Sequence, residues 1–332
     1  MSYKTAFKEI MRSYEADRDL AANLLQERKQ EIYRRLPRVQ EIDNEISRTS
    51  IRVAKQILTS GSNAKLLLEE LQHYSKALKE EKERLLAENG IPESYFTDIY
   101  RCLLCKDTGH ISHTERCQCL KQRLINKYYD LSNIKGLLEA ENFDTFDLRY
   151  YSQAENPSEG LSPQRNIQII YQTAMKFVEE FDRSFQNLLF YGDTGLGKTF
   201  LCNCIAKDLL DKGHTVLYVT APRIFKLVED YRFNRDDMED QDYAIDAVTD
   251  VDLLILDDLG AEFSTIVTSA ALFDIMNQRL LAKKATVIST NLSPDEFETH
   301  YSDRIVSRFL GHYKMSKFFG DDIRAKKKYK GI

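Results

Sequence analysis

Eight consecutive residues carry the strongest chemical pattern in the sequence. Residues 192–199 match G-x-x-x-x-G-K-[ST] in full. In such a loop, backbone N–H groups cradle phosphates at a helix N-terminus, the lysine neutralises the β- and γ-phosphate oxygens, and the hydroxyl ligates Mg²⁺. We therefore expect this loop to bind ATP or GTP through Gly192, Asp193, Thr194, Gly195, Leu196, Gly197, Lys198 and Thr199.

Two carboxylates and an amide follow apolar runs further along the chain. Residues 251–262, VDLLILDDLGAE, predict a buried strand that ends at Asp257 and Asp258, and ATVIST predicts a strand that ends before Asn291. The carboxyl ends of parallel strands lie beside the Gly-rich loop. We expect Asp257 to hold the Mg²⁺ shell, Asp258 to orient or deprotonate the attacking water, and Asn291 to bind the water and the γ-phosphate. A simple strand-ending turn is the alternative.

Two arginines lie four residues apart in the predicted helix SDRIVSRFLG, so Arg304 and Arg308 share one face. This face is either a solvated salt-bridge surface or a functional one. In the functional interpretation, Arg308 reaches the γ-phosphate of a neighbouring subunit and stabilises transition-state charge, which would make activity depend on assembly.

Four cysteines gather in residues 102–119, CLLCKDTGHISHTERCQC, as a C-x2-C pair, eleven residues and a C-x-C pair. Four thiolates at this spacing suit a tetrahedral zinc ion. His110 and His113 are possible substitutes or outer groups. Buried core thiols and a redox-active C-x2-C pair are the alternatives, but no strand precedes the pair as in a thioredoxin-like site. The expected ligands of a closed, structural zinc site are Cys102, Cys105, Cys117 and Cys119.

The elements that must position these groups follow from the apolar pattern. Residues 187–191 and 200–212 predict the strand and the helix that flank the Gly-rich loop, and residues 214–220 predict a further strand. The sequence therefore predicts an α/β domain with a parallel sheet.

The first ninety residues instead predict helices, because they are dense in charge and nearly free of Gly and Pro. We expect one helix to end at Pro37, a turn at residues 60–63, and a helix over residues 67–85 that ends at the Asn89–Pro92 turn. A bundle that packs its own apolar stripe and an arm that docks a partner protein fit this pattern equally.

Composition restricts the function classes. The chain has 332 residues, 42% hydrophobic and 30% charged, and its net charge of -5 gives no overall basic field. No run approaches the ~18 apolar residues of a membrane span, and residues 1–19 lack the apolar core of a signal peptide. We expect a cytoplasmic protein without a membrane partner, where thiols stay reduced.

One segment combines cations with aromatic residues. Residues 223–237, RIFKLVEDYRFNRDD, suit single-stranded DNA, because aromatic rings stack on bases and cations follow phosphates. The side chains concerned are Lys226, Tyr231, Arg232, Phe233 and Arg235. An amphipathic helix that packs on the sheet is an equally good interpretation, and the basic tail RAKKKYKGI is either a phosphate contact or a solvated end.

Together the motifs resemble the Walker A, Walker B, sensor 1 and box VII elements of AAA+ ATPases. They are most similar to the bacterial DnaC/DnaI-type helicase loaders, a clade that includes the IstB transposition ATPases. The cysteine cluster and the helical arm are similar to the DnaI-like branch. The resemblance covers residues 100–325 well and the N-terminal arm only in character.

The resemblance implies an ATPase that places the replicative hexameric DNA helicase on single-stranded DNA, with ATP binding or hydrolysis controlling retention and release. It implies ATP, Mg²⁺ and Zn²⁺ as cofactors and self-association into an AAA+ ring or spiral on the helicase. By this resemblance Lys198 and Thr199 are Walker A residues, Asp257 and Asp258 Walker B, Asn291 sensor 1, Arg308 the arginine finger and Arg324 sensor 2 in cis. The implied parts are a helical partner-docking domain (1–95), a Cys-rich zinc-binding module (96–125), a connector (126–163) and an AAA+ ATPase domain (164–332).

Two departures from the family pattern matter. Walker B usually ends in Asp-Glu, whereas this chain has Asp257 and Asp258, so we expect slow turnover, with Glu262 as a partial substitute. The short stretch after Arg324 predicts a domain without the full helical lid of many AAA+ proteins.

Two other functions compete with the loader, and the paired arginines and the lack of a visible substrate lid disfavour the second of them. An IstB-like transposition ATPase would coat duplex DNA and recruit a transposase, and a small-molecule kinase would use the same loop alone. The helical arm and the zinc module favour the loader, because a coating protein needs no separate docking domain.

Overall fold

The computed structural model describes residues 3–59, 64–112, 115–128, 134–233, 246–262 and 265–330. Two compact units make up the chain: residues 11–108 form one, and residues 1–10 with 109–332 form the other. The predicted turn at residues 60–63 lies outside the described residues. None of the helices in the described ranges is long and apolar enough to cross a membrane.

The first unit is helical, as predicted. Its elements are α1 (Tyr3–Arg35, of which residues 3–10 belong to the other unit), α2 (Pro37–Thr59), α3 (Ala64–Glu88) and η1 (Glu93–Phe96). The first helix ends before Pro37, and α3 ends before Gly90, whose φ of +68° favours glycine. The loops at both junctions pack a small core of Ile32, Val39, Leu86 and Ile91.

Polar contacts reinforce the α2–α3 pair. Arg38 of α2 donates to Glu81 of α3 at 2.8 and 3.2 Å, and Lys82 donates to Asp43 at 2.7 and 2.8 Å. Leu20 and Leu24 on α1 stay exposed, at 53% and 40%. Whether the unit only packs its own stripe or also docks a partner therefore stays a prediction.

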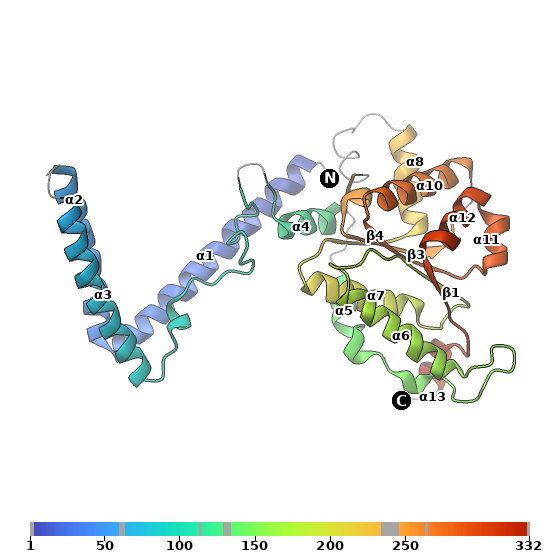
Figure 1. The fold of residues 1–332 in the computed structure, drawn as a ribbon, viewed down its shortest axis with the longest axis horizontal. Coiled ribbons are helices and arrows are strands. Elements are labelled where there is room, and N and C mark those ends of the chain that lie inside the picture. Colours follow the sequence, from blue (N-terminus) through green and yellow to red (C-terminus); the bar gives the residue numbers. More distant parts are fainter. Residues whose placement is uncertain are drawn as a thin grey trace. The chain divides into compact units, whose positions relative to one another are not determined.

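The second unit is built on a parallel sheet of five strands in the order β2-β3-β4-β1-β5 (Figure 1). The strands are β1 (Leu188–Tyr191), β2 (Val216–Thr220), β3 (Leu253–Leu259), β4 (Ala285–Thr290) and β5 (Lys314–Lys317). All four pairings are parallel, and β1 lies between β4 and β5 with Leu188 opposite Val287 and Lys314. The predicted fold class, an α/β domain with a parallel sheet preceded by a helical region, is confirmed.

Helices cover both faces of the sheet (Figure 1). The helices of this unit are α4 (Gln118–Tyr128), α5 (Ile134–Ala140), α6 (Pro163–Glu179), α7 (Lys198–Asp211), α8 (Ala221–Phe233), α10 (Ile266–Leu281), α11 (Pro294–His300), α12 (Asp303–His312) and α13 (Ile323–Lys330), with the short turns η3 (Phe143–Thr145) and η4 (Leu148–Tyr150). Alternate strand residues divide between two cores: Leu254 and Ile288 pack with α8, α10 and α12, whereas Ile255 and Val287 pack with α6 and α7.

The predicted connector packs as part of this unit. Leu138, Phe143 and Tyr151 are buried in the core that α6 and α7 share. Tyr151 also donates from its hydroxyl to the carbonyl of Leu196 at 2.9 Å. The aromatic residues of this stretch supply the apolar area that holds it against the Gly-rich loop.

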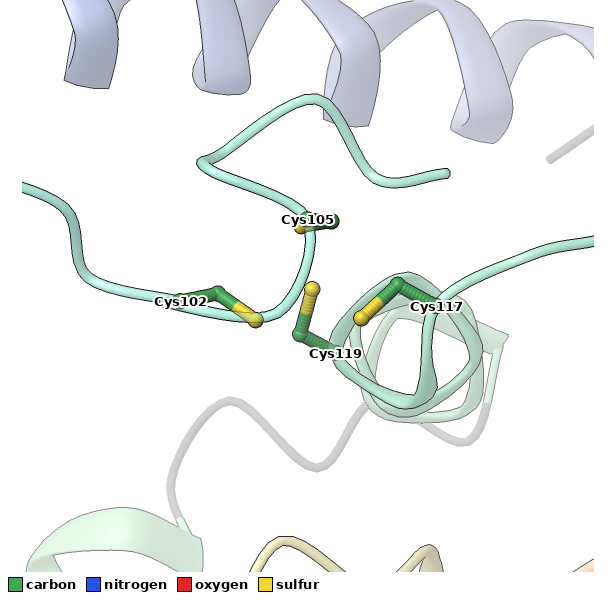
Figure 2. Close-up of side chains that lie close together, drawn as sticks. All are labelled: Cys102, Cys105, Cys117 and Cys119. Atoms are coloured by element: carbon green, nitrogen blue, oxygen red, sulfur yellow. The ribbon is translucent and has the colours of Figure 1, made fainter. Parts of the chain in front are cut away.

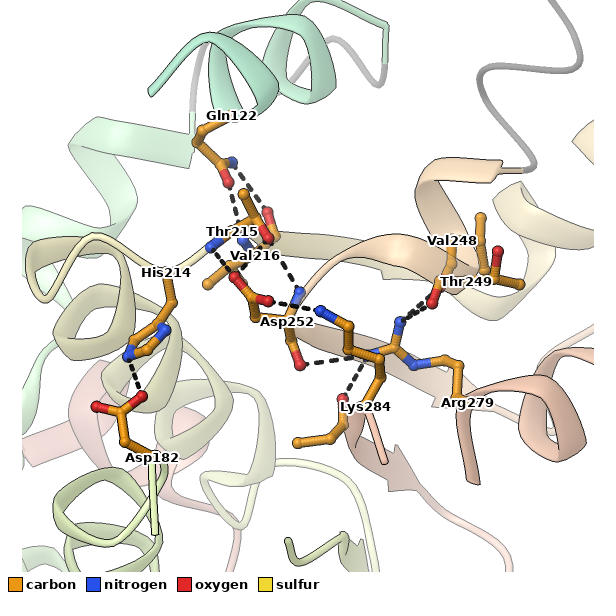
Figure 3. Close-up of polar contacts among 11 residues, drawn as sticks. Gln122, Asp182, His214, Thr215, Val216, Val248, Thr249, Asp252, Arg279 and Lys284 are labelled. Atoms are coloured by element: carbon orange, nitrogen blue, oxygen red, sulfur yellow. Dashed lines mark hydrogen bonds and ion pairs between the residues drawn. The ribbon is translucent and has the colours of Figure 1, made fainter. Parts of the chain in front are cut away.

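The amino-terminal edge of the sheet is held by a buried arginine and by one ion pair (Figure 3). Arg279 of α10 is 1% exposed and donates to the carbonyls of Val248 at 2.8 Å and Ala285 at 2.6 Å. Beside it, Lys284 donates to Asp252 at 2.7 Å, and the other oxygen of Asp252 accepts from the N–H and the hydroxyl of Thr215. These contacts join the starts of β2, β3 and β4.

A side-chain amide extends the edge strand β2. The Nε2 of Gln122, on α4, donates to the carbonyl of Val216 at 2.9 Å, and its Oε1 accepts from the N–H of Val216 at 2.8 Å (Figure 3). The amide thus takes both backbone bonds that a further strand would make, which leaves this part of the edge closed.

Candidate functional site

The Gly-rich loop joins β1 to α7. Gly197 caps α7 with a φ of +92°, and Gly195 has a φ of +76°. A Cβ atom on Gly195 would lie 2.1 Å from the Asp322 carboxylate, and one on Gly197 would lie 2.5 Å from the Tyr151 hydroxyl. Backbone conformation and close packing therefore both require glycine here. The first N–H groups of α7 have no acceptor within the helix itself, which suits them to phosphate oxygens.

Lys198 begins α7 and is only 5% exposed. Its ammonium donates to the carbonyls of Gly192 and Asp193 at 2.7 Å each and to Oδ1 of Asn291 at 2.8 Å. Burial lowers the pKa of Lys198, and the carboxylates of Asp258 and Asp257 partly offset this effect. The fold thus brings the predicted lysine and the predicted amide from β4 into direct contact.

Asp257 is buried on β3, with three hydroxyls around its carboxylate. The Thr199 hydroxyl lies 3.4 Å from Oδ1, the Tyr218 hydroxyl donates to Oδ2 at 2.6 Å, and the Ser289 hydroxyl donates to Oδ1. Thr199 and Asp257 are therefore adjacent oxygen donors, which is the ligand chemistry that Mg²⁺ prefers. Tyr218 and Ser289 hold the carboxylate in place.

Asp258, the next residue of β3, lies where the strand is irregular. The register between β3 and β4 shifts between Leu256 and Leu259, and Asp258 has a φ of +55°, a conformation that costs a non-glycine residue about 1–3 kcal/mol. Its side chain is exposed, and its N–H donates to the Ser289 hydroxyl at 3.2 Å. Burial and the Asp257 charge raise the pKa of Asp258, while Lys198 and Arg324 lower it in part.

A cavity of about 340 Å³ lies over this edge of the sheet. Residues 194–200 line it, together with Glu141, Asp258, Ala261, Asn291, Ile323 and Arg324. Gly192 and Asp193 line the neighbouring hollow, which shares Asn291 with the cavity. Asp257 lies beneath the cavity and reaches it through Thr199.

Arg324 reaches the cavity because α13 is attached to the Gly-rich loop. The N–H of Ile323 donates to the carbonyl of Gly195 at 2.9 Å, and the Asp322 carboxylate accepts from the N–H groups of Arg324 and Ala325 at 2.8 and 3.2 Å. The predicted cis arginine is thus on the same cavity as the Gly-rich loop.

An aromatic hollow of about 50 Å³ adjoins the cavity and shares Gly197, Phe200 and Ile323 with it. Phe146 lines it, and the centroid of its ring lies 5.3 Å from that of Phe200 and 6.2 Å from that of Tyr151. Flat apolar walls beside a phosphate loop suit a nucleotide base. Residues 142–152 are dense in aromatic side chains, but no motif connects them to a nucleotide site.

Arg308 does not line the cavity of its own chain. It lies on α12, where it stacks 4.1 Å over the Phe273 ring and donates to Oδ1 of Asn277 at 3.0 Å. Arg304 is exposed one turn earlier. Glu262 is also engaged elsewhere, because one oxygen accepts from the N–H of Gly260 at 2.8 Å and the other accepts from the Tyr301 hydroxyl.

The four predicted zinc ligands come together in one small cluster. The sulfur atoms of Cys102, Cys105, Cys117 and Cys119 all lie within 4.8 Å of one another and turn toward a common point (Figure 2). A tetrahedral ion with Zn–S bonds of about 2.3 Å needs sulfur atoms about 3.8 Å apart, so the set fits zinc after a small contraction.

The loop that carries the cysteines is tightly turned. Lys106, Asp107 and Gly109 all have positive φ, and the buried Asp107 carboxylate accepts from the N–H groups of Arg101 and Cys102 at 2.8 Å each. His110 lies outside the four-sulfur set, and His113 lies outside the described residues.

The segment with cations and aromatics forms part of α8. Ile224 and Phe225 are buried against the sheet and Lys226 is exposed, as an amphipathic helix requires. The side chains of Tyr231, Arg232 and Phe233, and all of Arg235, lie outside what the structure describes, so single-stranded DNA binding here stays a prediction.

Comparisons with known proteins relate the chain to a family and to several relatives. A family model described as "IstB-like ATP binding protein" matches residues 108–331. Over 154 residues the chain is 29% identical to the replicative helicase loader DnaC of Escherichia coli (strain K12). This alignment covers 46% of this chain and 62% of DnaC. Over 138 residues it is 28% identical to the replicative helicase loader DnaI of Bacillus subtilis (strain 168). This second alignment covers 40% of this chain and 42% of DnaI.

The chain therefore matches less than two thirds of the length of these two relatives. Among solved structures, a crystal structure of DnaI aligns with 55% of this chain and 94% of that chain, at 22% identity and a TM-score of 0.45.

Proposed function

The chain belongs to the family of IstB-like ATP binding proteins, and from this premise we propose that it is an ATPase that loads a replicative DNA helicase onto single-stranded DNA. Its membership confirms the family resemblance of its motifs. The observation that carries the proposal is the contact between Lys198 and Asn291 beside Thr199 and Asp257, because it joins the phosphate loop to two neighbouring strands. The names of the two relatives support the loader role.

In this proposal the residues that line the cavity bind ATP and Mg²⁺. The N–H groups of residues 195–199 and the Lys198 ammonium hold the phosphates, Thr199 and Asp257 hold Mg²⁺, and the aromatic hollow receives the base. Bound ATP supplies the γ-phosphoryl group that is transferred to water. Lys198 exchanges its carbonyl partners for phosphate oxygens, which offsets the cost of its burial.

Asp258 orients the attacking water and accepts its proton, and Asn291 fixes the water beside the γ-phosphate. The raised pKa of Asp258 makes its carboxylate a better base at neutral pH than an ordinary aspartate. Its short side chain leads us to expect slow turnover. Arg324 contacts the phosphates in cis.

Arg308 acts on the nucleotide of a neighbouring subunit. Its position on α12, away from the cavity of its own chain and fixed by Asn277 and Phe273, supports a role in trans. Hydrolysis then requires self-association into a ring or spiral on the helicase, and an arginine supplied in this way is worth ~10³–10⁵ in rate.

The helical unit, residues 11–108, docks the hexameric helicase, and the four-cysteine cluster holds a structural zinc ion that fixes the fold of its loop. Element analysis of the purified chain tests the second point. We expect one zinc ion per chain, and a Cys105→Ser variant that loses it.

The decisive test of the function is a sizing-column experiment with the chain and the replicative helicase of the same cell, with and without ATP. We expect a stable complex that survives loss of residues 126–332 but not loss of residues 1–120. No complex under any nucleotide condition would remove the loader proposal.

A second candidate follows from the family description itself, since IstB-like proteins include transposition ATPases in the resemblance described above. Such a protein would bind duplex DNA and recruit a transposase. Binding of labelled duplex and single-stranded DNA of equal length separates the two, because a loader prefers the single strand and a coating protein prefers the duplex.

A further inference from the structure

A carboxylate that belongs to none of the nucleotide-binding motifs lines the cavity. Glu141 follows α5, and its backbone is fixed on both sides. Its N–H donates to the carbonyl of Leu137 at 2.8 Å, and the Thr145 hydroxyl donates to the carbonyl of Ala140 at 2.9 Å. The side chain therefore faces the cavity from a rigid turn.

The carboxylate is held by a fully buried residue of α7. Nδ2 of Asn203, a residue with 0% exposure, donates to Oε2 of Glu141 at 2.6 Å, while Oδ1 of Asn203 is buried without a hydrogen-bond partner. The reversed amide would place its oxygen against the carboxylate. An unpartnered buried carbonyl is destabilising, and the charge-assisted bond to Glu141 is what offsets it.

The position of Glu141 limits what it can bind. Asn203 lies one helical turn after Thr199, so Glu141 sits beyond the magnesium donors, and the aromatic hollow continues the cavity past Phe200. A carboxylate repels phosphates and accepts hydrogen bonds from hydroxyl groups. Within the described part of the chain, no lysine or arginine forms an ion pair with Glu141.

We propose that Glu141 binds the ribose hydroxyls of the nucleotide, that Asn203 positions it, and that the site thereby prefers ribonucleotides to deoxyribonucleotides. This inference rests on the proposed function, in which ATP occupies the cavity. It adds a residue that determines specificity, between the Gly-rich loop and the aromatic hollow.

The wild-type chain provides the first test, which needs no variant. Titration calorimetry would compare ATP, 2′-deoxy-ATP and 3′-deoxy-ATP in the presence of Mg²⁺, with binding and not turnover as the readout. We expect at least one deoxynucleotide to bind about tenfold more weakly, the loss typical of one hydrogen bond to a charged group. Equal binding of all three overturns the inference and leaves ATP binding intact, whereas no binding of any of them also removes the proposed function.

Two variants then locate the effect. Glu141→Gln keeps an acceptor for Asn203. We expect it to weaken ATP binding and to leave unchanged the affinity for the deoxynucleotide that binds more weakly to the wild type. The ratio of the two affinities, which measures discrimination, should therefore fall at least threefold. Asn203→Leu, which removes the unpartnered carbonyl, should lower discrimination without lowering the unfolding temperature. An equal loss for ATP and deoxynucleotides in Glu141→Gln, seen only with Mg²⁺, would assign Glu141 to the metal and overturn the ribose assignment.

Discussion

At the amino-terminal edge of the sheet, Arg279 and Lys284 are surrounded by protein acceptors, whereas at the carboxyl edge Lys198 and Asp258 face a cavity. Burial lowers the pKa of Arg279 to about 10, and it also lowers the pKa of Lys198. Burial thus disfavours the charged form of both side chains. The guanidinium is enclosed by carbonyl and hydroxyl acceptors of the fold, whereas the ammonium also lines a cavity, where phosphate oxygens would replace its carbonyl partners in the proposed function. One edge therefore stabilises the unit, and the other is placed to bind a ligand.

The largest expected effect is on stability and comes from Arg279→Met. The substitution leaves the carbonyls of Val248 and Ala285 and the Thr286 hydroxyl without their shared donor. At about 1–3 kcal/mol for each unsatisfied buried group, reduced by the removed cost of burying the cation, we expect a net loss of about 3 kcal/mol in the free energy of unfolding, measured by denaturant titration. The exposed Arg183→Met is the matched control, and an equal loss there would refute the special role of Arg279.

The second effect is on binding and comes from Lys198→Met. The apolar stem is kept and the charge at the phosphates is lost, so we expect ATP affinity to fall about 100-fold, equivalent to about 2.7 kcal/mol. The free energy of unfolding should change by less than about 1 kcal/mol, because Gly192 is only half-buried and Asp193 is exposed, so that water can replace the ammonium at their carbonyls. A variant that binds ATP as the wild type does would place the nucleotide elsewhere.

The third effect, about tenfold, concerns the metal and comes from Tyr218→Phe. This substitution removes the hydroxyl that orients Asp257, and outer groups of this kind are worth about 10–100-fold in metal affinity. We expect the Mg²⁺ concentration needed for half-maximal ATP binding to rise about tenfold, while binding without Mg²⁺ is unchanged. Tyr191→Phe, on strand β1 of the same sheet, should leave both quantities as they are.

The smallest effect is a pH dependence at the amino-terminal edge. Burial would raise the pKa of Asp252, but hydrogen bonds from Lys284 and Thr215 lower it below its usual value. A carboxyl group with a depressed pKa contributes stability above its unfolded pKa of about 3.9 and loses it as the pH falls through the folded pKa. For the partly exposed Lys284–Asp252 pair we expect a contribution below about 1 kcal/mol to the free energy of unfolding. In urea titrations between about pH 6 and pH 3, the free energy of unfolding of Lys284→Met should therefore fall less than that of the wild type.

Much of the carboxyl edge could be predicted because its residues lie within or directly after patterned segments. The Gly-rich loop is contiguous, and Asp257, Asp258 and Asn291 end apolar strands. Short apolar runs also predicted β1 to β4 and their parallel sheet. The strand β5 was missed, because the four residues KMSK at an edge carry no apolar run and are exposed or half-buried.

The groups that support the site could not be found in the same way. Tyr218, Ser289 and Glu141 act through side chains that the fold brings from other elements, and no spacing rule connects them to the Gly-rich loop. The contacts at the amino-terminal edge could not be predicted from the sequence for the same reason. Arg279 reads as a solvated helix residue until the fold surrounds it with carbonyls.

The most direct test of the account is the stabilisation of three proteins by Mg·ATP in one thermal unfolding series: wild type, Arg279→Met and Lys198→Met. At a ligand concentration 100 times Kd, a single site adds about 2.7 kcal/mol. We predict the same ATP-induced stabilisation for the wild type and for Arg279→Met, which starts from a lower unfolding temperature, and almost none for Lys198→Met, which starts near the wild type. Stabilisation of Lys198→Met by ATP, or its loss in Arg279→Met, would contradict the division between a stabilising and a binding edge.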